Sequence, residues 1–132
     1  MATPAVGSSA ANPVLLVYGA PINFTWTDPS LNVDGTAIVA GEVTGYTVGI
    51  RNTATAGSAA GTYPVTVAAP GATDASALAS GAAAALVPGI YAAAIQTNGP
   101  VNSAWSVEIF FEVPTAPVVP ETPAAPSNPQ VT

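Results

Sequence analysis

Short segments of alternating apolar and polar residues, separated by glycine and proline, constrain the fold of this chain most strongly. With 12 glycines and 14 prolines in 132 residues, the chain has little room for long helices, which both residues destabilise. The segment 22–26 places Ile22, Phe24 and Trp26 on one face, a period of two that is typical of a half-buried strand. The alanine-rich stretch 75–86 is interrupted by Gly81 and leaves room for a short helix only. The pattern predicts an all-β protein.

Six strands are predicted at the spacing expected of a β-sandwich. They cover residues 14–18, 22–26, 45–52, 62–69, 89–97 and 105–113. Pro64 cannot donate to a strand ladder, so we expect the segment 62–69 at a sheet edge. Strands with one buried face each need a second sheet to cover them, so we expect a single antiparallel sandwich over residues 12–113.

The expected core depends on a few large side chains, because hydrophobic residues make up 49% of the chain but aromatic residues only 7%. In the last predicted strand, Val107, Ile109, Phe111 and Val113 alternate toward the core, and Glu108, Phe110 and Glu112 face solvent. The core residues predicted from such alternation are Phe24, Trp26, Tyr46, Tyr91, Ile109 and Phe111.

The charge inventory excludes several classes of function. The chain has one basic residue, Arg51, against seven acids, and no histidine or cysteine. Binding to nucleic acid or anionic lipid is not expected, since both need clustered basic residues. No catalytic triad, thiolate nucleophile or ordinary zinc site can be built. Glu108 and Glu112 lie about 13 Å apart on a strand, too far for a glycosidase pair. We therefore expect no enzyme activity and no cofactor.

An acidic loop raises the question of calcium. Ser30, Asn32 and Asp34 alternate before Gly35, as at the start of an EF-hand loop. The first ligand position is a serine, however, and the twelfth is Gly41, where a glutamate belongs. The preferred interpretation is a turn, in which Gly35 supplies a positive φ and Asp34 caps its own backbone.

The C-terminal segment 114–132 has proline at every third position from 114 to 129. A polyproline II helix has three residues per turn, so these prolines would share one edge over roughly 50 Å. A stiff spacer, a solvated end and an arm that contacts another protein are alternative interpretations. Residues 1–11 form a second candidate arm. The candidate partner contacts are Phe110, Pro114, Pro117, Pro120, Pro123, Pro126 and Pro129.

Several stretches together resemble a fibronectin type III domain of the bacterial and phage type. They are FTWTDPSLNVDGTAI (24–38), GYTVGI (45–50), LVPGIY (86–91) and SAWS (103–106). The resemblance implies an immunoglobulin-like sandwich of a three- and a four-stranded sheet, with Tyr91 as the corner tyrosine. The chain departs from the family pattern at 27–44 and 75–85. The family is associated with spacing, adhesion and assembly.

These features favour a virion structural protein, specifically a small phage capsid decoration protein held by a tail or an edge strand. Its partner would be the major capsid protein or another virion protein, with a homo-oligomer as a further arrangement. The N-terminal residues show no secretory signal and no segment reaches the about 20 apolar residues of a membrane helix. The alternative is a spacer or adhesion module of a bacterial extracellular enzyme or adhesin. A third hypothesis, carbohydrate binding, would use Tyr18, Tyr63, Trp105 and Phe110.

Overall fold

The computed structural model describes residues 8–131 and contains seven strands and one short 3₁₀ helix. The elements are β1 (Val14–Leu15), β2 (Asn23–Thr25), β3 (Gly45–Asn52), β4 (Val65–Ala69), β5 (Ser76–Leu78), η1 (Gly81–Ala85), β6 (Gly89–Asn98) and β7 (Ile109–Val113). The predicted all-β character is confirmed, because η1 is the one helical element within residues 8–131. Gly81 begins η1 with a φ of +56°, and the alanine-rich stretch forms no longer helix.

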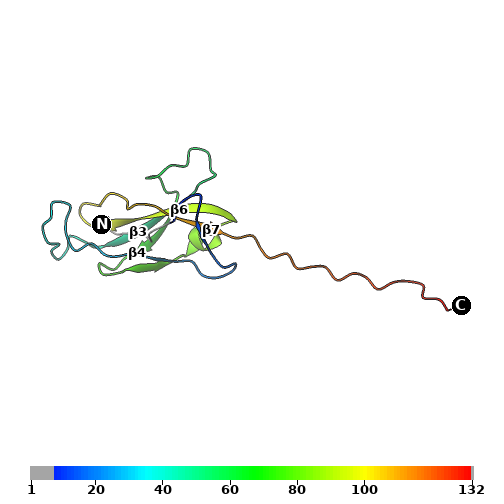
Figure 1. Ribbon diagram of the computed structural model, residues 1–132. Coiled ribbons are helices and arrows are strands. Elements are labelled where there is room, and N and C mark those ends of the chain that lie inside the picture. The colour runs from blue at the N-terminus through cyan, green and yellow to red at the C-terminus, as the bar shows by residue number, and fades with distance from the viewer. Residues whose placement is uncertain (1–7, 132) are drawn as a thin grey trace.

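The strands form two sheets (Figure 1). The larger has the order β1-β7-β6-β3-β4, and the smaller pairs β2 with β5. The longest ladder joins β3 to β6, from Gly45 opposite Asn98 to Asn52 opposite Tyr91. All pairings are antiparallel except that of β1 with β7, so the larger sheet is mixed. β4 lies at its edge, and Pro64 immediately precedes that strand.

Aromatic side chains of the two sheets meet in the core. The Phe24 ring of β2 meets the Phe111 ring of β7 edge to face, with centroids 5.7 Å apart. The Trp26 and Tyr46 rings lie 5.4 Å apart. Burial raises the pKa of Tyr46 to about 12, because the phenolate would lose its hydration. Of the six residues expected in the core, five are buried, and Ile109 is partly exposed at its margin.

The sheets contain five and two strands instead of the four and three that the resemblance implied. The difference arises at β1, which pairs with β7 and not with β2. The strand expected over 14–18 also ends early. The amide of Ala20 donates to the carbonyl of Val17, and Gly19 has a φ of +76°. Tyr18 therefore lies in this turn and not in the strand, although the apolar run 14–18 predicted a longer strand.

The last strand begins at Ile109, four residues later than expected. Ile109 is opposite Ala93, so an unbroken register would place Val107 opposite Ile95. Instead, Ile95 forms hydrogen bonds with Ser106. The Ser106 amide donates to the Ile95 carbonyl, and the Ile95 amide donates to Ser106 Oγ, both at 2.9 Å. This one-residue offset resembles a β-bulge. It turns Val107 outward, where it is 77% exposed, so its expected inward position was wrong.

The C-terminal tail leaves the two sheets as an extended segment (Figure 1). Residues 114–131 contain no helix or strand, and every residue from 115 to 131 is exposed. At the other end, Ser8 lies against β7, since the Phe110 amide donates to Ser8 Oγ at 3.0 Å. Ser8 therefore contacts the larger sheet, whereas residues 9–11 are exposed. The remainder of the expected N-terminal arm, residues 1–7, and Thr132 of the tail lie outside the described residues.

Candidate binding surfaces

The only cation of the chain is held on the outer face of the larger sheet. Arg51 of β3 forms a bidentate ion pair with Glu108, with both nitrogen–oxygen distances at 2.8 Å. Tyr63 Oη donates to Glu108 Oε2 at 2.9 Å, and Arg51 also donates to Ser58 Oγ at 3.0 Å. Each of the two charged side chains is 11% exposed. The expectation that Glu108 faces solvent was therefore wrong, because the Arg51 and Tyr63 side chains cover it.

These contacts favour the charged forms of both partners. Hydrogen bonds from Arg51, and then from Tyr63, hold the pKa of the Glu108 carboxyl below its ordinary value, against the opposing effect of burial. The same ion pair raises the pKa of Arg51. The pKa of Tyr63 is raised, mainly by burial. Because its charges are satisfied internally, this ion pair suits a structural role better than proton transfer.

Three aromatic side chains line a groove together with Glu108 of the ion pair. The Tyr63 ring meets Trp105 edge to face, with centroids 4.7 Å apart. Tyr63 also lies directly over Gly49, where an added Cβ would be 2.5 Å from the ring. Tyr63, Trp105 and Phe110 line a shallow groove of about 590 Å³ together with Ser8.

Ala92 and Ala94 are fully buried although they lie on this outer sheet face, opposite Arg51 and Gly49.

Phe110, the candidate interface contact of the last strand, belongs to the same groove. Its side chain is half-buried and lines the groove with Tyr63 and Trp105. Tyr18, the fourth aromatic considered for carbohydrate binding, lines a separate groove. The edge-to-face geometry of Tyr63 and Trp105 does not give the flat stacking surface on which a sugar ring would lie.

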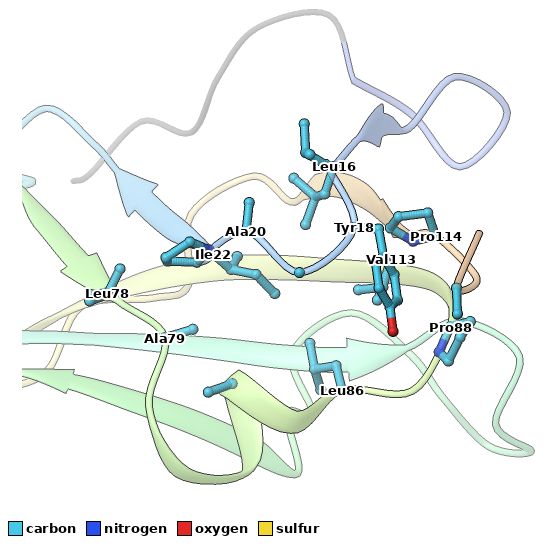
Figure 2. A pocket seen from close by; sticks show the side chains of 15 residues that line it. Leu16, Tyr18, Ala20, Ile22, Leu78, Ala79, Leu86, Pro88, Val113 and Pro114 are labelled. Atoms are coloured by element: carbon cyan, nitrogen blue, oxygen red, sulfur yellow. The ribbon is translucent and has the colours of Figure 1, made fainter. Parts of the chain in front are cut away.

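A second groove, of about 590 Å³, lies where the C-terminal tail leaves the sheets (Figure 2). Its walls come from the β1–β2 connection, the end of β5, the stretch from η1 to β6, and the start of the tail. Figure 2 shows Ile22 and Ala79 at one end, and Tyr18, Pro88 and Pro114 at the other. None of its lining residues is charged. We call this site the apolar groove.

The acidic loop folds as a turn that uses its own oxygen atoms. Asp34 Oδ1 accepts hydrogen bonds from the amide and the hydroxyl of Thr36, at 3.0 and 2.6 Å. These bonds lower the pKa of Asp34. Gly35 has a φ of +86°, and Asn32 donates to Glu42 Oε2 at 2.8 Å. Within residues 8–131, no three acidic side chains gather closely enough to hold a metal ion.

The prolines proposed as contacts fall into two groups. Pro114 is half-buried and lines the apolar groove, whereas those from Pro117 to Pro129 are exposed along the tail. The tail was evident from the sequence, whereas the apolar groove and the ion pair were not. The available signal for the ion pair was Arg51 itself, a lone cation on the outward face of a predicted strand.

No family model matches this chain, and no curated protein or solved structure is significantly similar to it. None of the helical structure within residues 8–131 is long and apolar enough to cross a membrane.

Proposed function

We propose that this chain is a non-enzymatic structural protein whose β-domain is an immunoglobulin-like sandwich of the fibronectin type III kind. Support for the fold comes from the smaller sheet packed on the larger one through Phe24 and Phe111. A further feature is the Tyr91 hydroxyl, which donates to the Val87 carbonyl at 2.7 Å. A tyrosine bonded to backbone a few residues upstream is the corner found in many such sandwiches.

The proposed role is attachment of this domain to a larger assembly through the tail. The observation that carries the proposal is the fully exposed stretch 115–131, which leaves the domain with a proline at every third position. A polyproline II segment loses little entropy on binding and leaves its backbone polar groups free for a partner. A flexible tail of the same length would have to become ordered on binding, at an entropic cost for each residue.

The assembly we favour is a virus particle, with the chain as a capsid decoration protein on its outer surface. The partner would be the major capsid protein or another virion protein. The domain has an aromatic core and an internally paired cation, and the whole chain carries a net charge of −6. These properties suit a soluble, displayed domain more than a catalyst. The alternative setting, a spacer module of an extracellular enzyme or adhesin, would use the same segment as a linker.

The test is rebinding to particles that lack the protein. The full chain should bind in a saturable manner, and deletion of residues 114–132 should abolish binding while leaving the melting temperature nearly unchanged. The matched control keeps the tail composition but gathers its six prolines into one block, which removes the three-residue spacing. Particles that retain the tail-deleted chain at the same copy number would refute attachment through the tail.

A further inference from the structure

The tail and the apolar groove have complementary chemistry, and both are present on each molecule. We propose that the tail of one copy binds in the apolar groove of a second copy, so that neighbouring copies are linked from tail to groove. This inference rests on the proposed role of the tail as a contact segment. It adds a second partner for that segment, namely another copy of the same chain.

The lining of the groove fits a proline-rich ligand. Aromatic and proline side chains form the grooves that bind polyproline II segments, because flat rings pack between the pyrrolidine rings of the ligand. Tyr18 is 54% exposed, lines the groove beside Pro114 and Pro88, and carries a hydroxyl at the far end of its ring (Figure 2). That hydroxyl can donate to a carbonyl of the bound segment. Pro21 and Leu86 supply further apolar surface.

Charge also favours this site as the meeting point of two copies. Each molecule carries a net charge of −6, so two copies repel each other and contacts that bring their acidic side chains together are disfavoured. The apolar groove has no charged lining residue, and the tail carries a single acid, Glu121. Contact between tail and groove therefore sets the single acid of the tail against a surface without charge.

The geometry indicates a second copy as the donor of the tail. Pro114 and Ala116 already form one wall of the groove, and the exposed residues that follow run away from the domain (Figure 1). A proline-rich segment is stiff over several residues, which disfavours a reversal onto its own domain. Residues 117–129 span roughly 40 Å at 3.1 Å per residue, enough to reach a neighbour. Since donor and acceptor surfaces differ, the contact can propagate into rings or chains.

The experiment is sedimentation equilibrium of the full-length protein over a wide concentration range. The groove variant carries Tyr18→Ser and Leu78→Ser, at two side chains that are 54% and 60% exposed. The tail variant carries Pro120→Gly, Pro123→Gly and Pro126→Gly. A matched control carries Leu31→Ser and Val101→Ser, at apolar residues that are 54% and 87% exposed and do not line the groove.

The wild type and the control should self-associate, and the groove and tail variants should each associate at least about tenfold more weakly. A wild type that stays monomeric up to about 1 mM, or a groove variant that associates as the wild type does, would overturn the proposal. A synthetic peptide of residues 114–131 provides a second readout. Added to the full-length protein, it should shift backbone amide resonances of Gly19 and Ala79, and shifts confined to other residues would also overturn it.

The two proposals fail separately. The groove variant keeps an intact tail, so its binding to particles tests attachment without self-association. Loss of particle binding on tail deletion, together with unchanged self-association in the groove variant, would leave the proposed function standing and reject the link between copies.

Discussion

Replacing Arg51 by methionine would leave the Glu108 carboxylate without its counter-ion on the outer face of the larger sheet. Exposed ion pairs contribute about 0.2–1 kcal/mol, whereas removal of one partner from a buried pair costs about 3–5 kcal/mol. Both side chains are only 11% exposed and are joined by two bonds of 2.8 Å. The energetic contribution of this ion pair should therefore be closer to that of a buried pair than to that of an exposed one. We expect Arg51→Met to lower the free energy of unfolding by about 2–4 kcal/mol.

The assay is denaturant unfolding at pH 7, with linear extrapolation to water. The double variant Arg51→Met with Glu108→Gln removes both charges and keeps an acceptor for the Tyr63 hydroxyl, so it should fall within about 1 kcal/mol of the wild type. A loss below about 1 kcal/mol in the single variant would contradict the assignment of this ion pair to the buried class. So would a double variant as unstable as the single one.

Three further changes test other parts of the structure. Trp26→Ala should cost about 3–5 kcal/mol as a large deletion from the core, and a loss below about 1 kcal/mol in denaturant unfolding would contradict the burial of that ring. Gly49→Ala should cost about 1–3 kcal/mol, because the new methyl group would overlap Tyr63; unchanged stability would show that the ring has room to move. The lowered pKa of Glu108 stabilises the protein above the ordinary value of 4.5, and this contribution should be lost as the pH falls from there through the folded-state value. Glu108→Gln should lack that part of the acid-induced loss, and an identical pH dependence of stability in the two proteins would contradict the pairing with Arg51.

Alternation along the sequence located the core well where a strand has one buried face. Phe24 and Trp26 in one segment, and Tyr46, Val48 and Ile50 in another, point inward as their period of two indicates. The same rule failed at Val107, because the offset at Ser106 changes the register by one residue. That offset depends on hydrogen bonds to Ile95, eleven positions away, which a local pattern does not contain.

Other features depend on contacts between distant residues. Glu108 pairs with an arginine 57 positions away, so its polarity alone suggested solvent exposure. β1 joins the larger sheet through a parallel pairing with β7, and the run of apolar residues around Leu15 did not specify a partner. The apolar groove is assembled from four separate parts of the chain, each of which appears unremarkable by itself. The tail, in contrast, was evident because its signal is a local repeat.

We propose that this chain is part of a virus particle and is held there through its tail. Mass spectrometry of purified particles and of secreted protein from the same source tests it most directly, with the intact mass and the C-terminus as readouts. If the chain is a decoration protein, it should be found in the particle fraction at a defined copy number. Recovery of its peptides only within a longer secreted polypeptide would contradict attachment to a virus particle and make the proline segment a linker between domains.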